Sequence, residues 1–255
     1  MAIGLPLAGQ GTPPEILRIR GGSYRLKTTI FAGAEATSNP VLVIILHGDA
    51  PFAKPSYQDT LARRIAARYP GVVAAAILRP GYTDPEGNTS EGIRGQTTGD
   101  NYNATNTDAI ASAIGELRKR FHPHRVVLVG HSGGSALSAN ILGRHPALAN
   151  AALLVSCPCD VTAWRAHMLA KTKFAGFDGP IVTLSPIDLV ARVSASVPVT
   201  MMVGDSDDVA PPVLTRAYEA RATQLGKRVH VVVVHGGHEI FLRPEVLDEL
   251  GRLLQ

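Results

Sequence analysis

Short runs of aliphatic residues alternate along this sequence with longer segments in which apolar positions recur at helical spacing. In the first half the apolar runs are VLVIIL at 41–46, VVAAAIL at 72–78 and RVVLVG at 125–130, and helices are predicted near 57–69 and 105–121. The interior of each run lacks polar positions, so each strand should be buried on both faces. The pattern predicts an α/β fold with a mostly parallel sheet and helices on both of its faces.

The same alternation continues to the C-terminus. Further elements are predicted, in the order strand, strand, helix, strand and helix, at 151–156, 197–204, 213–226, 228–236 and from Pro244 onward. The segment 23–33, SYRLKTTIFAG, alternates instead, which predicts an antiparallel strand at the edge of the sheet. The length and the 45% hydrophobic content favour one α/β domain over residues 1–255.

Two segments interrupt this alternation. Residues 81–103, GYTDPEGNTSEGIRGQTTGDNYN, form a long polar connection, and such a connection in a compact domain is usually functional or disordered. It should form one wall of a pocket at the carboxyl ends of the strands. Residues 160–196, which include Trp164, Met168 and Phe174, lie between two predicted strands and could form a small cap over the edge of the sheet.

The segment VLVGHSGGSAL at 127–137 places a serine among glycines where an apolar strand gives way to a helix. Its GHSGG at 130–134 fits the pattern G-x-S-x-G. Glycines on both sides allow a sharp turn that leaves the hydroxyl of Ser132 at the N-terminus of the helix. This context predicts a nucleophile, and the alternative is a tight turn capped by a serine.

A serine hydroxyl becomes nucleophilic when a base takes its proton and a carboxylate orients that base. The run MMVGDSDDVAPP ends one predicted strand with acidic residues, and VVVVHGGHEIF ends the next with two histidines. Ser132, Asp207 and His238 follow one another in the order nucleophile, acid, base.

From about residue 23 to the C-terminus, the chain resembles α/β-hydrolase-fold serine hydrolases of the esterase, prolyl-oligopeptidase-like or serine-aminopeptidase-like branches. The resemblance implies that Ser132 is the elbow nucleophile, Asp207 the acid and His238 the base before the last helix. It also implies an oxyanion hole formed by the backbone N–H of Gly133 and that of Asp49, in the turn ILHGDAP.

The acid has alternatives. The turn from Gly204 to Pro211 departs from the family pattern G-x-x-D-x-x-V-P at Val209 and Ala210, so Asp205 and Asp208 remain candidates beside the favoured residue. Of the two histidines after the next strand, the one in the Gly-His pair is favoured as the base, and His235 is interpreted as a loop residue.

Several residues around this site have predicted roles of their own. A carboxylate beside an oxyanion would oppose catalysis, so the side chain of Asp49 is expected to point away, or else to hold a substrate's ammonium group. Arg79 is expected to pair with a nearby carboxylate and brace its loop. Tyr82 and Tyr102 are candidates for lining the pocket, and His131 is interpreted as a packing residue.

These residues predict a serine hydrolase that acts through an acyl-enzyme without a metal or an organic cofactor. The expected substrate is a small-molecule carboxylic ester, and the polar composition of 81–103 favours short-chain or polar esters. Hydrolysis of an amide or a short peptide is the alternative, because the mechanism is shared. A non-catalytic binding protein on the same fold is a more remote alternative.

Composition narrows the choice of partners. The 25 Lys and Arg residues exceed the 21 Asp and Glu residues by a net charge of +4 and are scattered along the chain, which argues against a nucleic-acid patch.

Cys157 and Cys159 are separated by one residue, a spacing that strains a mutual disulfide and gives too few thiols for a structural zinc site. They are interpreted as packing residues.

The start of the sequence lacks the charged and apolar regions of a signal peptide, and no later segment reaches 18 uninterrupted apolar residues. We therefore expect a protein without a membrane span, in the cytoplasm, or secreted or periplasmic if a signal peptide has been removed. The sequence leaves the oligomeric state open.

Overall fold

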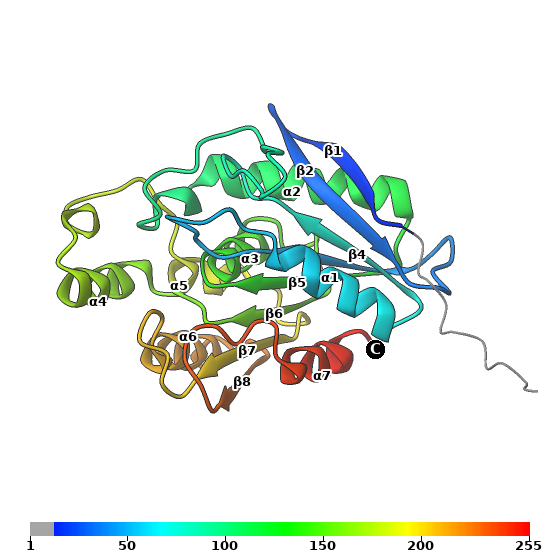
Figure 1. The fold of residues 1–255 in the computed structure, drawn as a ribbon. Helices are drawn as coiled ribbons and strands as arrows, with labels where there is room; N and C mark the ends of the chain where they lie inside the picture. Colours follow the sequence, from blue (N-terminus) through cyan, green and yellow to red (C-terminus); the bar gives the residue numbers. More distant parts are fainter. Residues whose placement is uncertain (1–12) are drawn as a thin grey trace, which may run out of the picture.

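An eight-stranded sheet runs through the centre of the protein (Figure 1), whose computed structural model describes residues 13–255. From one edge to the other the strands are β1 (Glu15–Gly21), β2 (Tyr24–Ala32), β4 (Val72–Ile77), β3 (Val41–Leu46), β5 (Arg125–His131), β6 (Ala151–Val155), β7 (Val199–Gly204) and β8 (Val229–Val234). β1 pairs with β2, and β2 with β4, in antiparallel fashion, and all the other pairs are parallel.

Helices cover both faces of this sheet, as the apolar strands predict. The longer ones are α1 (Tyr57–Arg68), α2 (Ala104–Phe121), α3 (Gly133–Arg144), α4 (Val161–Thr172), α6 (Pro212–Gln224) and α7 (Pro244–Leu253), and the short α5 spans Pro186–Leu189. Helices α1 and α7 lie on one face of the sheet, and α2, α3 and α6 lie on the other (Figure 1). Their apolar side chains form one core with each face. In β3, successive residues alternate between the two cores.

The predicted edge strand at 23–33 is antiparallel, but it does not lie at the edge. It corresponds to β2, whose outer side is covered by β1. Gly21 pairs with Tyr24, so only two residues turn the chain between the strands, and Gly22 takes the positive φ of 61° that such a turn favours. Within β1, the run LRIR at 17–20 alternates at the period of a strand, a local signal from which this strand could have been predicted.

Two expectations concerned a signal peptide at the N-terminus and a membrane-spanning helix. Residues 1–12, where the search for a signal peptide began, lie outside the described residues. Within residues 13–255, every helix is either too short or too polar to cross a bilayer.

The two cysteines were predicted to be separate packing residues, and this prediction is wrong. Cys157 and Cys159 are buried and joined by a disulfide, rather than packing as separate thiols. A disulfide that closes over one residue is strained where the backbone holds the two cysteines too far apart. The backbone after β6 places the two Cα atoms 5.1 Å apart, which lies within the range that disulfides span.

The topology gathers the predicted chemical residues at one edge of the sheet. From β3 the chain passes to β4 on one side and later to β5 on the other, so the connections diverge at this point. In open α/β sheets, ligands bind beyond the carboxyl ends of the strands at such a switch point. The turns that follow β3, β5, β7 and β8 all end there and hold Asp49, Ser132, Asp207 and His238.

The start of α3 lies against the end of β3 because Gly134 has no side chain. A Cβ atom at this position would overlap the carbonyl oxygens of Leu46 and His47. Gly130 is equally constrained, since a Cβ there would lie 2.5 Å from the carbonyl oxygen of Gly134. The glycines around the serine are therefore required by backbone contact between β3, β5 and α3.

We expect Gly134→Ala to destabilise the fold by about 1–3 kcal/mol, the usual cost of forcing a methyl group into a packed region. Thermal unfolding should show a midpoint several degrees lower. Gly115→Ala is the matched control, because a Cβ on Gly115 in α2 meets open space and alanine favours a helix interior. Equal midpoints for the two variants would contradict this account of the glycine.

Candidate active site

Ser132 stands at the sharp turn between β5 and α3 in a conformation that side chains rarely adopt, with φ of 50° and ψ of −120°. Its N–H donates to the carbonyl oxygen of Val155 at 2.8 Å, and the hydroxyl of Ser135 donates to the carbonyl oxygens of Gly130 and Val155. These bonds join the turn to the neighbouring strand β6. The backbone strain at the predicted nucleophile is therefore held in place by its surroundings.

Asp207 and His238 lie beside each other at the ends of β7 and β8. Both carboxylate oxygens of Asp207 are 3.0 Å from Nδ1 of His238, and the N–H groups of Val209 and Ala210 donate to Oδ1. Burial favours the neutral acid, but the hydrogen bond and the charge of His238, with the N–H of Ala210, hold the pKa of Asp207 below its usual value. A charged carboxylate thus orients this imidazole.

The other two carboxylates of the turn have different partners. Asp205 accepts a hydrogen bond from the N–H of Gly236 and lies 3.1 Å from Nδ1 of His235, whose side chain is exposed. Asp208 forms an ion pair with Lys171 of α4. Within residues 13–255, no group of three or more His, Cys, Asp or Glu side chains is arranged to hold a metal ion.

Ser132 and His238 line one cavity of about 560 Å³ together with Asp49. The turn after β3 packs directly on the serine, since a Cβ on Gly48 would lie 3.0 Å from Cβ of Ser132. Gly133 begins α3, so its N–H is one of those that have no acceptor within the helix. The two predicted oxyanion donors therefore belong to backbone segments that lie next to the serine.

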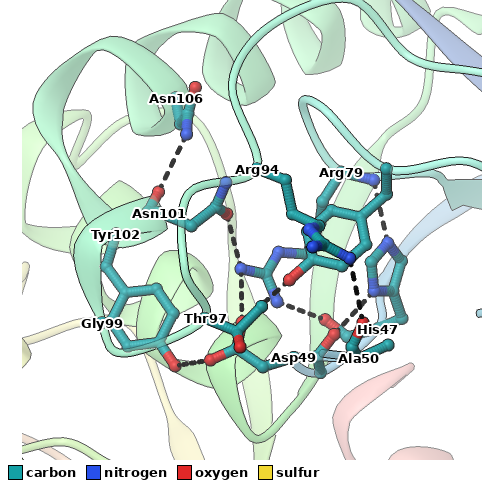
Figure 2. Close-up of polar contacts among 12 residues, drawn as sticks. His47, Asp49, Ala50, Arg79, Arg94, Thr97, Gly99, Asn101, Tyr102 and Asn106 are labelled. Atoms are coloured by element: carbon teal, nitrogen blue, oxygen red, sulfur yellow. Dashed lines mark hydrogen bonds and ion pairs between the residues drawn. The ribbon is translucent and has the colours of Figure 1, made fainter. Parts of the chain in front are cut away.

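The side chain of Asp49 was expected to point away from the site, but it does not. A Cβ on Gly133 would lie 2.7 Å from its Oδ1, so the carboxylate is beside the first turn of α3. Its charge is matched by Arg79, whose Nη2 lies 3.0 Å from Oδ1 (Figure 2). Tyr102 donates to Oδ2 at 2.5 Å and Tyr82 donates to Oδ1 at 3.2 Å.

The same contacts correct the roles expected of the two tyrosines. Tyr82 and Tyr102 are buried, and neither is among the described residues that line the cavity. Their hydroxyl groups instead lie behind the cavity wall and donate to Asp49. The two tyrosines were expected to contact the substrate because they lie in a polar loop. In the structure, both hydroxyl groups donate hydrogen bonds to the carboxylate of Asp49 instead.

Arg79 pairs with a carboxylate, as predicted, and it also binds the turn that carries that carboxylate. Its backbone N–H donates to Nε2 of His47, and its guanidinium donates to the carbonyl oxygen of His47 and to Oδ1 of Asn101 (Figure 2). His47 accepts at Nε2, so the proton of the neutral ring is on Nδ1, which faces the carbonyl oxygen of Gly48 at 2.7 Å. Burial and the charge of Arg79 keep the pKa of His47 well below its usual value.

The walls of the cavity differ in character. Part of the polar connection 81–103 forms one wall, as expected, through Arg94, Gln96, Thr97 and Thr98. A second wall is apolar and comes from the segment interpreted as a cap and from the turn after β7, with Trp164, Met168, Phe174, Phe177 and Val209. The polar loop alone therefore gave an incomplete description of the pocket.

His131 was interpreted as a packing residue, but it also connects two loops of the site through hydrogen bonds. Tyr57 of α1 accepts a hydrogen bond from the N–H of Gly48, and its hydroxyl lies 2.8 Å from Nδ1 of His131. Nε2 of His131 lies 3.1 Å from the carbonyl oxygen of His238, and its ring stacks on Phe241. A ring protonated at Nε2 satisfies both contacts and links the turn after β3 to the loop of His238.

Comparison with known proteins agrees with this architecture. The sequence model of the alpha/beta hydrolase family matches residues 43–192, more than half of the chain, and the protein belongs to this family. No curated protein sequence matches the chain significantly.

Solved structures share the fold at low identity. An esterase from Pyrococcus furiosus superposes with a TM-score of 0.72 at 14% identity, covering 99% of this chain and 98% of that one. A puromycin-hydrolyzing peptidase from Mycobacterium tuberculosis gives 0.73 at 17% identity, covering 94% of this chain and 38% of its own. The acylaminoacyl peptidase of Pyrococcus horikoshii gives 0.71 at 15% identity, over 96% of this chain and 40% of its own, so this chain spans about two-fifths of that peptidase.

Burial and the charge of His238 lower the pKa of His131 to about 3, which predicts a stability that depends on pH. In the unfolded chain this histidine titrates near 6.5, so between pH 6.5 and 3 the unfolded state binds a proton that the folded state does not. Stability should therefore fall as the pH falls through this window. Between pH 7 and pH 5 this one histidine should account for about 2 kcal/mol.

Urea unfolding of His131→Gln at pH 7 and pH 5 tests this expectation. A glutamine amide can accept from Tyr57 and donate to the loop of His238, but it does not titrate. The loss of stability between the two pH values should be about 2 kcal/mol smaller than in the unaltered protein. Replacing the exposed His230 with glutamine is the control, and an equal change in both variants would refute the assignment to His131.

Proposed function

We propose that this protein is a serine hydrolase that cleaves carboxylic esters of small substrates through an acyl-enzyme. The observation that carries the proposal is the strained turn that presents Ser132 in the same cavity as His238, whose Nδ1 is bound by the buried, charged Asp207. A positive φ at a serine between a buried strand and a helix is costly and persists where it serves a function.

In the proposed reaction, Oγ of Ser132 attacks the carbonyl carbon of the ester while Nε2 of His238 takes its proton. Asp207 keeps Nε2 free to act as the base and stabilises the imidazolium. The N–H groups of Gly133 and Asp49 donate to the oxyanion. His238 then returns the proton to the departing alcohol, and a water molecule, activated by the same imidazole, hydrolyses the acyl-enzyme.

The charge around Asp49 helps to decide between two substrate classes, namely esters and peptides with a free ammonium group. A free carboxylate here would oppose the oxyanion and favour a substrate with an ammonium group, which was the argument for an aminopeptidase. Arg79 and two tyrosine hydroxyls already satisfy this carboxylate. The pair carries no net charge, so it is compatible with an oxyanion and offers little attraction to an ammonium group.

Ser132→Ala should reduce the hydrolysis of p-nitrophenyl butyrate by roughly 10⁶-fold, to the residual rate of a site without its nucleophile. A fluorophosphonate probe should label the unaltered protein and not the variant. Ser138→Ala is the matched control, because this buried serine in the same helix bonds to the carbonyl oxygen of Gly134 and does not line the cavity. An unlabelled, inactive wild-type protein would instead support the binding-protein alternative.

Two adjacent acid and histidine pairs permit a matched test of the acid. Asp207→Asn should lower kcat by about 10⁴-fold, because an amide cannot hold the required tautomer or stabilise the imidazolium. Asp205→Asn removes the carboxylate that faces the exposed His235 and should leave kcat within a few-fold of its original value. Initial rates with p-nitrophenyl butyrate measure both, and a larger loss in the second variant would transfer the role to Asp205.

A further inference from the structure

The cavity that holds Ser132 also contains a cation that the proposed reaction does not use. Arg94 is half-buried in the polar wall, and within residues 13–255 it forms no ion pair with a carboxylate. Of its five N–H donors, only those on Nη1 face protein acceptors, the carbonyl oxygens of Ala50 and Pro51, each at the long distance of 3.5 Å. Most of the hydrogen-bonding capacity of this side chain is available to a ligand.

The two other arginines near the cavity have fixed roles within the protein. Arg79 is fully buried and bound to Asp49, His47 and Asn101. Arg165 of α4 is also buried and donates to carbonyl oxygens, including those of Thr98 and Gly179. Arg94 differs from both because it lines the cavity and, among residues 13–255, forms no ion pair; its guanidinium carbon lies 5.9 Å from the ring centroid of Tyr82.

The acidic residues nearby do not neutralise this charge. Asp49 is paired with Arg79, and the carboxylate of Asp100 accepts from the N–H groups of Gln96 and Thr98. Glu239 also lines the cavity, but its side chain is exposed, so water screens its charge. Among the described residues, these three carboxylates therefore leave the positive charge of Arg94 without an ion-pair partner.

The loop that carries Arg94 is fixed from both ends. The side-chain amides of Asn101 and Asn106 donate to the carbonyl oxygen of Ile93, just before it (Figure 2 shows the two asparagines). After it, Asp100 and Arg165 hold the backbone at Thr98, and Thr97 is kept at an unusual φ of 60°. Because the loop is already held in one conformation, it loses little conformational entropy when a ligand binds.

We propose that Arg94 binds a carboxylate of the substrate, so that the preferred substrates are esters that carry a carboxylate group a few bonds from the scissile carbonyl. The hydrocarbon part between the two groups then packs on the apolar wall formed by Trp164, Met168 and Phe177. A planar guanidinium recognises carboxylate with two parallel hydrogen bonds, which suits this residue type. The proposal names the substrate class of the proposed ester hydrolase and rests on it.

The carboxylate can belong to the acyl part or to the alcohol part of the ester, and two pairs of substrates separate these sources. The acyl pair is p-nitrophenyl hydrogen adipate, which is anionic, and p-nitrophenyl hexanoate, which has the same number of acyl carbons and is neutral. The alcohol pair is 4-carboxyphenyl butyrate and its neutral amide, 4-carbamoylphenyl butyrate. Spontaneous hydrolysis is subtracted from each enzymatic rate.

For each pair, the ratio of kcat/KM for the anionic ester to that for the neutral ester is compared between proteins, so that differences in intrinsic reactivity cancel. We expect Arg94→Gln to lower this ratio by at least about tenfold in one of the pairs, as for loss of a hydrogen bond to a charged group. The loss should fall mainly on the anionic ester. Arg94→Lys should retain part of the preference, and added NaCl should reduce it in the wild type.

Arg221→Gln removes the same charge from an exposed position on α6 outside the cavity, and it should leave both ratios unchanged. If Arg94→Gln slowed anionic and neutral esters equally, Arg94 would only support the backbone at Ala50, and the proposal would be wrong. Unchanged ratios in both pairs would overturn it as well. Wild-type cleavage of the neutral hexanoate tests the ester hydrolase separately, so a failure of one proposal is not mistaken for a failure of the other.

Discussion

The buried ion pair between Arg79 and Asp49 is the interaction on which the geometry of the site depends. Arg79 follows β4 and Asp49 follows β3, so their contact fixes the ends of two adjacent parallel strands relative to each other. Removing one partner of such a pair leaves an uncompensated charge in the protein, typically at a cost of about 3–5 kcal/mol. The two tyrosine hydroxyls and the amide oxygen of Asn101 supply the additional hydrogen bonds that make burial of the pair tolerable.

This pair also explains why a carboxylate is tolerated beside a predicted oxyanion hole. An isolated charge on Asp49 would raise the energy of a neighbouring negative oxygen, and the effect would be large because the cavity is partly shielded from water. With the guanidinium 3.0 Å away, the carboxylate becomes one end of a dipole. The same guanidinium helps to keep His47 neutral, so the turn after β3 has a fixed pattern of donors and acceptors.

The sequence predicted those features that depend on local pattern. Continuous apolar runs correctly indicated the parallel strands, and the glycines around Ser132 indicated the turn between β5 and α3, because backbone contact leaves no room for side chains there. The strand β1 was missed although its residues alternate, and its pairing displaced β2 from the edge. The disulfide was rejected on an argument about strain that the local backbone removes.

The remaining features of the site depend on contacts between distant segments, for which the sequence carries no local signal. Tyr57 reaches His131 across 74 positions, and Trp164 of α4 donates to the carbonyl oxygen of Val209 across 45. Neither partner is recognisable from its neighbours in sequence. The direction of the Asp49 side chain likewise depends on Arg79, which lies 30 positions further along the chain, after another strand.

Two connections outside the sheet form the polar and the apolar wall of the cavity. They are joined to each other and to the turn that contains the proposed acid. Arg165 of α4 donates to the carbonyl oxygen of Thr98 in the polar wall. The residue directly before it on the same helix, Trp164, packs in the apolar wall and bonds to the turn that contains Asp207. A displacement of α4 would therefore disturb both walls and the orientation of His238 together. Substitutions in α4 would therefore affect several parts of the site at once, whereas the side chain of Arg94 takes no part in these bonds.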